Sequence, residues 1–301
     1  MAREEMKMVR EDQTVAYGLA WTIDKPIANV VIATGMEEHS GRYDDFAKFL
    51  NKNGYNVYCL DFYGQGQNVT KGGEKLGCVP RSAFRKYVTT LYEMILKIKV
   101  STLPVYLFGH SMGSFHVQDY IQRYGAHIDK AVLSGTNGKD ILSKMGFWIS
   151  KLVVTKKNYN NPSMFLASLA IGAYQKSVKD RKYDSDWISH DEEIVRKYEE
   201  DQLSGKGSSN GFYFEMLKGI NRLPKKQFML KIPHRLPILL IAGDQDPVGH
   251  YGKGVLKLEK AYRKVGLIDV QTIIYEGKRH EVLNEIGRDK VYDDVLAFLK
   301  K

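Results

Sequence analysis

Short apolar runs alternate along the chain with longer segments in which apolar residues repeat at helical spacing. Several runs are continuously apolar, as expected of strands buried on both faces of a parallel sheet. The predicted strands are Val30–Ile32, Val57–Leu60, Val105–Phe108, Ala131–Leu133, Ile238–Ala242 and Gln271–Tyr275. The predicted helices are Tyr43–Asn53, Ala83–Lys99, Gly113–Tyr124, Gly254–Lys264 and Val291–Lys300. This alternation predicts an α/β fold with a mostly parallel central sheet flanked by helices, to which Thr14–Ile23 adds an antiparallel hairpin.

The alternation stops between residues 138 and 226, where no buried strand is evident. Two apolar segments, Met145–Val154 and Met164–Tyr174, are followed there by a charged stretch and then by a turn rich in Gly and Ser. We therefore predict a helical insertion over 138–226. The core is predicted to consist of residues 1–137 and 227–301.

Composition is that of a folded globular protein and by itself identifies no partner. Apolar residues make up 43% and charged residues 27% of the 301 positions, which excludes a disordered, collagenous or disulfide-scaffold protein. The net charge of +10 permits attraction to anionic surfaces. The basic residues of the chain are scattered and its aromatic residues form no stacking motif, so no nucleic-acid partner is expected. Within the insertion, residues 139–182 hold nine bases and two acids, whereas 183–201 hold eight acids and two bases.

The cysteines and the N-terminal segment bear on the compartment. Cys59 and Cys78 are too few for a disulfide framework and lack metal-ligand spacing, and Cys59 lies in an apolar run that predicts a core position. Residues 1–13 are charged and resemble no secretory signal, and no run approaches 18 apolar residues. We predict a cytoplasmic protein, in peripheral contact with membrane at most, and we expect no metal and no cofactor.

Ser111 is the strongest candidate for a reacting side chain. It lies at the centre of Gly109-His110-Ser111-Met112-Gly113, between an apolar run and a predicted helix. This is the strand-turn-helix context of a nucleophile elbow. Side chains two residues before or after the serine would collide with the neighbouring strand and helix, which accounts for the glycines. We predict that Ser111 is a nucleophile exposed at the carboxyl edge of the sheet.

A serine nucleophile needs a base, and the base needs an orienting acid. The expected order along the chain is serine, acid, histidine. Asp246 follows the run Ile238–Ala242, and His280 follows Gln271–Tyr275, so both are predicted at the same sheet edge as Ser111. Asp244 competes for the acid role, but the Pro-Val continuation after Asp246 favours the latter.

Two backbone groups are predicted to stabilise the oxyanion. The loop Thr34–Tyr43 follows the first strand of the predicted sheet, which is where one donor is expected, and the residue after the nucleophile supplies the other. The candidates are the N–H groups of Met36 and Met112. His110 is predicted to pack away from the site. Structural roles are predicted for His116 and His127, and His190, His234 and His250 have no strand-end context.

With these motifs the sequence resembles the monoacylglycerol lipase and lysophospholipase branch of the α/β-hydrolases. The resemblance depends on Glu38–Tyr43, Asp61–Gly66, Gly109–Gly113, Asp246–Val248 and His280, and it extends over nearly the whole chain. It implies that Ser111, Asp246 and His280 are the triad, that Met36 and Met112 form the oxyanion hole, and that the insertion is a cap over Ser111. The family usually has His-Gly where Thr34-Gly35 stands here, which affects the shape of the entrance.

The apolar segments of the insertion suit an acyl chain. The predicted substrate-binding residues are Met145, Trp148, Leu152, Phe165 and Leu169. An equally weighted alternative is that these residues only pack the cap onto the sheet. Lys144, Lys151, Lys156 and Lys157 lie among them, so we also predict that this basic half of the cap contacts anionic lipid.

The sequence thus predicts a serine esterase or lipase that hydrolyses single-chain acyl esters, such as monoacylglycerol or lysophospholipid, through an acyl-enzyme on Ser111. A short-chain carboxylesterase or a serine aminopeptidase would use the same triad. The peptidase would need an acidic pair to bind a free amino terminus, for which Glu37 and Glu38 are candidates. Outside enzymes, the same fold serves as a ligand receptor.

Overall fold

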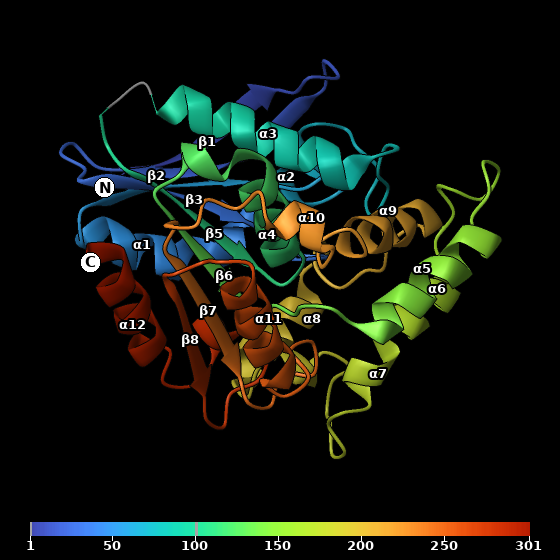
Figure 1. Ribbon diagram of the computed structural model, residues 1–301. Helices are drawn as coiled ribbons and strands as arrows, with labels where there is room; N and C mark the ends of the chain where they lie inside the picture. The colour runs from blue at the N-terminus through green and yellow to red at the C-terminus, as the bar shows by residue number, and fades with distance from the viewer. Residues whose placement is uncertain (1, 100–101) are drawn as a thin grey trace.

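One eight-stranded sheet forms the centre of the molecule (Figure 1). The computed structural model describes residues 2–99 and 102–301. The strands are β1 (Ala2–Val9), β2 (Val15–Thr22), β3 (Ala28–Ala33), β4 (Tyr55–Leu60), β5 (Val105–His110), β6 (Lys130–Ser134), β7 (Ile238–Gly243) and β8 (Val270–Tyr275). Their order in the sheet is β1-β2-β4-β3-β5-β6-β7-β8. Strands β3 to β8 are parallel, which confirms the predicted α/β class.

The antiparallel hairpin is present, but its first strand was not predicted. Strand β2 occupies most of the predicted run and pairs antiparallel with both β1 and β4. Strand β1 is the charged segment Ala2–Val9 at the edge of the sheet. Its charged side chains are tolerated because an edge strand leaves part of its surface in water, so the segment lacks the apolar run by which buried strands are recognised.

Helices cover both faces of the sheet. Helices α3 (Ala83–Ile98), α4 (Met112–Tyr124) and α11 (Lys253–Lys264) share one core cluster with Val31 and Ala33 of β3. Helices α1 (Asp44–Lys52) and α12 (Asp289–Lys300) share the other with Val30 and Ile32. Alternate residues of one strand therefore enter opposite cores, which is why its run is continuously apolar. The shorter elements of the core are η1 (Ser40–Tyr43), α2 (Gly66–Thr70), η2 (Gly125–His127), α10 (Lys226–Met229) and η4 (Val282–Asn284).

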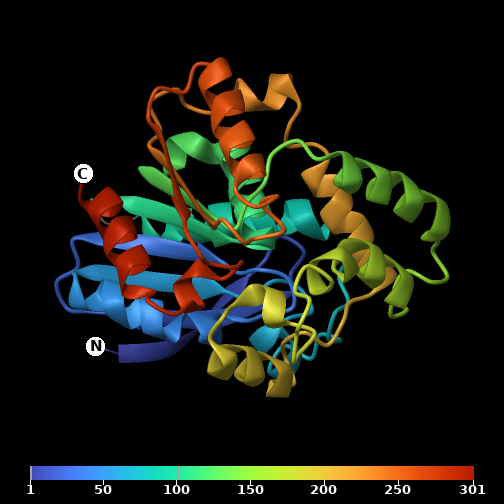
Figure 2. The same cartoon turned by 90° about the horizontal axis from the view of Figure 1, so that it is seen from below.

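The segment between β6 and β7 is helical and adds no strand to the sheet within residues 138–226, all of which the structure describes. Its helices are α5 (Ile141–Val153), α6 (Met164–Ala170), α7 (Gly172–Gln175), η3 (Asp186–Ile188), α8 (Glu192–Glu200) and α9 (Asn210–Ile220). Figure 2 shows α5 and α6 projecting to one side of the sheet. Helix α9 lies against α3 and α4, and its Phe212 and Tyr213 belong to the core cluster. The exact division into core and cap stays a prediction.

The carboxyl ends of β3, β5, β7 and β8 lead into the loops that carry the candidate site residues. Because these strands are parallel neighbours or near neighbours, their ends meet at one edge of the sheet. In the part of the chain that the structure describes, no helix is long and apolar enough to cross a membrane.

Candidate active site

Ser111 occupies a strained turn between β5 and α4. Its backbone has φ 52° and ψ −121°, a conformation that L residues rarely adopt. A Cβ on Gly113 would lie 2.0 Å from the carbonyl oxygen of Ala33, and one on Gly109 would lie 2.5 Å from that of Gly113. Only glycine fits at both positions, so the sequence motif is explained by close approach of the backbone on each side of Ser111.

His280 is oriented by Asp246. Its Nδ1 lies 3.0 Å from Oδ1 of Asp246, and both side chains are buried. A proton on Nδ1 donates to the carboxylate and leaves Nε2 free to accept another proton. Nε2 is buried and has no hydrogen-bond partner among the described residues. Asp244, the competing acid, instead accepts the backbone N–H of Gly277 at 2.8 Å and thereby stabilises the turn after β8.

The environment of His280 changes its proton affinity. Burial lowers the pKa of the imidazole, but the adjacent Asp246 carboxylate outweighs burial, and the pKa is raised above its ordinary value. Glu281 and Glu38 act in the same direction. The imidazolium form is therefore stabilised, which is what a base needs when it takes a proton from a serine hydroxyl.

The two predicted oxyanion donors lie beside Ser111. Met36 and Met112 line the same cavity as the serine. Met112 is the first residue of α4, so its N–H is one of the groups at a helix N-terminus that have no partner within the helix. The opposing loop is close, because a Cβ on Gly35 would lie 3.3 Å from Cβ of Ser111.

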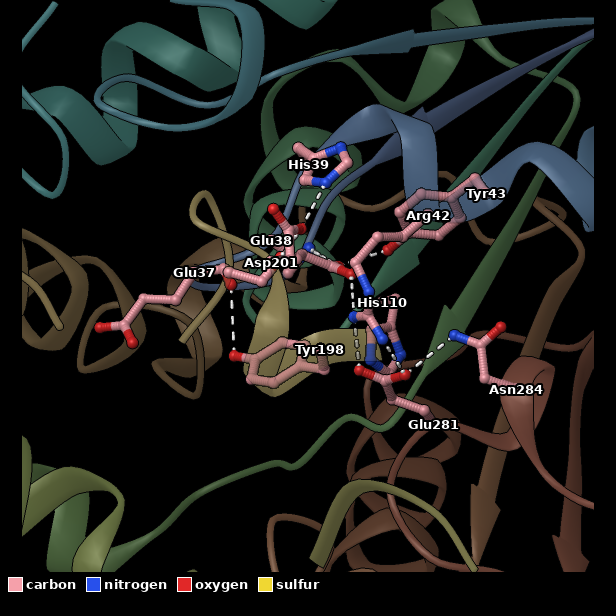
Figure 3. Close-up of polar contacts among 12 residues, drawn as sticks. Glu37, Glu38, His39, Arg42, Tyr43, His110, Tyr198, Asp201, Glu281 and Asn284 are labelled. Carbon is pink, nitrogen blue, oxygen red and sulfur yellow. Dashed lines mark hydrogen bonds and ion pairs between the residues drawn. The ribbon is translucent and has the colours of Figure 1, made fainter. Parts of the chain in front are cut away.

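A buried ion cluster supports this loop from behind (Figure 3). Arg42 donates to both carboxylate oxygens of Glu281, each at 2.7 Å, and to Glu38 at 3.0 Å. Glu38 also accepts the backbone N–H of Gly35 and the hydroxyl of Tyr43. Burial raises the pKa of Glu281, but the guanidinium outweighs burial and lowers it to about 2. Burial raises the pKa of Glu38.

The contacts within this cluster were not predicted from the sequence. Arg42 and Glu281 are 239 positions apart, and neither is a reacting group. The sequence does place both residues near predicted site residues, since Glu281 is next to His280 and Arg42 lies in the loop Thr34–Tyr43.

The prediction for His110 was wrong. Its ring lies against that of His280, with the centroids 4.8 Å apart, and its Nδ1 is 3.3 Å from the hydroxyl of Ser134. Burial, together with the charge of His280, lowers the pKa of His110 to about 3, so the ring is neutral near pH 7. His116 is structural as predicted, because it is fully buried against Phe62 and Phe84.

An apolar cavity of about 140 Å³ opens beside Ser111. Leu169 is the one predicted acyl-binding residue that lines it. Met145, Trp148, Leu152 and Phe165 are 54–83% exposed and lie outside its lining. Leu166, which belongs to the same apolar segment that the sequence indicated, lines it as well. Residues of this wall that the sequence did not reveal are Phe115, Tyr174, Trp187, Met216, Leu217 and Ile220.

Ser111 also lines a smaller cavity of about 80 Å³, which we call the polar cavity. Its lining includes Gly35, Glu38, Ser111, Gln175, Ser185, Tyr198, His280 and Glu281. Trp187 contributes to both cavities, and its ring lies 5.0 Å from that of His280. Ser111 therefore lines both an apolar space and a more polar one.

No group of three or more His, Cys, Asp or Glu side chains in residues 2–99 and 102–301 is arranged to hold a metal ion. Cys59 is fully buried, as predicted for a core residue, and Cys78 is a partly exposed free thiol.

The strand order and the similarity to solved lipases and esterases identify the fold as that of the α/β-hydrolases. The family model and the relatives identify the protein as a serine ester hydrolase. It belongs to the family described as serine aminopeptidase, S33, whose model matches residues 24–287. The predicted resemblance to the monoacylglycerol lipase and lysophospholipase branch is confirmed by the relatives.

Three similar proteins illustrate this assignment to a family of ester hydrolases. A monoacylglycerol lipase of Mycolicibacterium smegmatis is 29% identical over 93% of this chain and 90% of its own length. The phospholipase YtpA of Bacillus subtilis is 27% identical over 92% of this chain and 97% of its own. A thermostable carboxyl esterase from Bacillus coagulans, solved in complex with glycerol, superimposes with a TM-score of 0.92 at 26% identity, covering 100% of this chain and 98% of that one.

Proposed function

We propose that this protein hydrolyses single-chain acyl esters, such as a monoacylglycerol or a lysophospholipid, through an acyl-enzyme on Ser111. The observation that carries the proposal is that Ser111 lines both the apolar and the polar cavity. An ester with one acyl chain and one polar head has the same asymmetry. The apolar cavity takes the chain and the polar cavity takes the head, which brings the ester carbonyl to the serine.

In the proposed reaction, each step is assigned to a particular residue. The hydroxyl oxygen of Ser111 attacks the carbonyl carbon while Nε2 of His280 accepts the proton, and Asp246 stabilises the resulting imidazolium. The N–H groups of Met36 and Met112 donate to the oxyanion. His280 then returns its proton to the leaving alcohol. Water repeats the sequence on the acyl-enzyme and releases the fatty acid.

The aminopeptidase alternative has less support. A peptidase of this type needs free carboxylates to bind a substrate amino terminus, and Glu37 and Glu38 were the candidates. Glu38 is bonded to Arg42, Tyr43 and Gly35, and Glu37 accepts hydrogen bonds from the insertion. Both residues line the polar cavity, but their carboxylates are buried and already accept these hydrogen bonds from the protein. A short-chain carboxylesterase or a ligand receptor would use the same pocket and is separated from our proposal by experiment.

We also propose that the insertion contacts anionic membrane. Leu152, Met164 and Phe165 are exposed by 83%, 88% and 56% on α5 and α6. Lys144, Lys151, Lys156 and Lys157 lie on or directly after α5. Exposed apolar side chains among lysines are typical of surfaces that bind the lipid interface. Substrate esters reside there, and α5 and α6 also supply walls of the apolar cavity.

The test is fatty-acid release from long-chain monoacylglycerol, lysophosphatidylcholine and a short-chain nitrophenyl ester. We expect the long-chain esters to be preferred, and Ser111→Ala to lower all rates by about 10⁴-fold or more. Ser150→Ala is the matched control, since this buried serine bonds only within α5, to the carbonyl of Phe147, and its loss should leave the rates unchanged. Release from the short ester alone would favour a carboxylesterase. Silence on all three esters with folded protein would favour the peptidase or the receptor.

A further inference from the structure

We infer that Glu37 is a positioning residue that couples the place of the insertion to the geometry of the oxyanion hole. The inference rests on the proposed function, because it concerns the loop that holds the Met36 N–H beside Ser111. Its basis is a set of contacts that join this one residue to α8, to the loop after α8 and to α9 of the insertion, and also to the core.

The carboxylate of Glu37 is bound by the insertion. It accepts hydrogen bonds from the Ser208 hydroxyl at 2.9 Å, the Tyr213 hydroxyl at 3.1 Å and the Gly207 N–H at 3.2 Å. Figure 3 shows this side chain extending away from the cluster of Glu38, Arg42 and Glu281, so the two neighbouring glutamates serve different contacts.

The backbone of Glu37 is bound as well. Its carbonyl oxygen accepts from the Gly205 N–H at 3.0 Å and from the Tyr198 hydroxyl at 3.2 Å, both in the insertion (Figure 3). Its own N–H donates to Gln65 of the core at 2.8 Å. With φ of 56°, Glu37 is in the left-handed region, which is unfavourable for most residues other than glycine and asparagine. The surrounding hydrogen bonds stabilise this backbone conformation.

Met36 lies between two fixed backbone groups. On one side the Gly35 N–H is bound by Glu38, and on the other the Glu37 N–H is bound by Gln65. The direction of the Met36 N–H follows from the orientation of these neighbours, since peptide planes share the Cα atoms between them. A rotation at Glu37 would therefore alter the donor that faces the oxyanion.

Burial makes the coupling strong. Glu37 is 9% exposed, and each of the three donors to its carboxylate is a neutral group of the insertion. If the insertion moved away, the carboxylate would lose those donors and the left-handed backbone would lose two more. The oxyanion loop is thus held in its active geometry when residues 198–213 are seated on it.

The test compares two tyrosines of the insertion whose hydroxyls reach core residues. Tyr213→Phe removes a donor to Glu37. Tyr159→Phe instead removes a hydroxyl whose acceptors are the carbonyl of Pro80 at 3.2 Å and the carboxylate of Glu215 at 3.4 Å, neither of which is in the oxyanion loop. Both are buried, so their losses of stability should be similar. We expect Tyr213→Phe to lower kcat for a soluble ester about tenfold with KM changed less than twofold, and Tyr159→Phe to leave both unchanged.

A second readout reports on the oxyanion directly. A trifluoromethyl ketone adds to Ser111 and forms a tetrahedral oxyanion, so its affinity should fall in parallel with kcat in Tyr213→Phe. Glu37→Gln keeps one acceptor oxygen and should fall between wild type and Glu37→Ala in both measurements. Parallel loss of activity in Tyr159→Phe, or unchanged ketone affinity in the Glu37 variants, would overturn the coupling.

Failure of this inference is distinguishable from failure of the proposed function. If Ser111→Ala abolishes hydrolysis while Tyr213→Phe and Glu37→Gln retain full kcat, the coupling alone is overturned. If Ser111→Ala retains hydrolysis, the proposed mechanism is wrong and the coupling falls with it.

Discussion

The two halves of the insertion are attached to the rest of the molecule in different ways. The acidic half, residues 183–209, is bound by polar contacts to the loop after β3 and to the loop after β8. Asp201 pairs with His39 at 2.8 Å, and the N–H of Glu281 donates to the carbonyl of Ile188 at 2.8 Å. The basic half, residues 139–182, contacts mainly other helices of the insertion, and its α5 and α6 project to one side of the sheet (Figure 2). It exposes many apolar side chains.

This difference separates two tasks within one insertion. The acidic half supplies fixed walls to the site, as when Trp187 lies over His280 and the Tyr198 ring lies 4.8 Å from the guanidinium carbon of Arg42. The basic half is attached to the core through the Asp140–His250 pair, the bond from Tyr159 to the carbonyl of Pro80 and the bond from Cys78 to the carbonyl of Asn160. Among the described residues, none of these contacts involves the loop after β3 or the loop after β8. Buried polar contacts specify one position, whereas an exposed apolar face suits a variable, fluid surface.

The largest effect is expected where the acidic half meets the core, at Arg42. Arg42→Leu leaves the buried carboxylates of Glu38 and Glu281 without their cation. Breaking a buried pair in this way costs about 3–5 kcal/mol, which urea unfolding measures. Arg196→Leu is the control, because its pair with Glu200 is on the exposed side of α8 and should leave the unfolding midpoint unchanged. Equal effects of the two substitutions would remove the distinction between anchored and exposed charges.

The sequence predicted those parts of the site that follow strands. Ser111, Asp246 and His280 each come directly after an apolar run, and parallel strands bring their carboxyl ends to one edge whatever else the chain does. The triad could therefore be proposed without any knowledge of side-chain contacts. The fold class followed from the same alternation.

The support around the site could not be predicted in this way. Glu37 and Tyr213 are 176 positions apart, and nothing in a single sequence pairs a glutamate with a distant tyrosine. The face of a helix that points to a cavity was also ambiguous. Apolar residues occur all around α5, so Met145, Trp148 and Leu152 were assigned to the acyl site although the structure exposes them.

A second comparison uses aliphatic residues from each half. Ile188 in the acidic half is 2% exposed, and Leu152 in the basic half is 83% exposed. Ile188→Ala should lower the free energy of unfolding by about 2–5 kcal/mol through lost burial and a cavity. Leu152→Ala should change it by about 0.5 kcal/mol or less. Thermal or urea unfolding of both variants measures the contrast, and a loss in Leu152→Ala as large as that in Ile188→Ala would mean that the basic half is also packed.

The pH dependence of hydrolysis tests the protonation of His280, against which Trp187 of the acidic half lies. Because the pKa of His280 is raised, its imidazole is protonated at a higher pH than that of an ordinary histidine, and the protonated ring cannot accept the serine proton. We expect kcat/KM for a soluble ester to fall about tenfold per unit of pH below that pKa. Near- and far-ultraviolet circular dichroism at each pH controls for unfolding. A profile that stays flat down to pH 6 would contradict the raised pKa.

The smallest effect is expected on the outer face of the basic half, and it should appear only with membranes. Lys151→Glu and Lys156→Glu should each weaken binding to vesicles containing anionic lipid about fivefold or more, while hydrolysis of a soluble ester stays unchanged. Lys197→Glu is the matched control, since this exposed lysine lies on α8 of the acidic half. Co-sedimentation over a series of anionic lipid contents measures binding. Binding that ignores lipid charge, or that Lys197→Glu weakens equally, would show that the basic half is not the membrane-facing surface. The exposed apolar residues of α5 and α6 would then have lost their proposed partner, and the basic half would keep only its part in lining the apolar cavity.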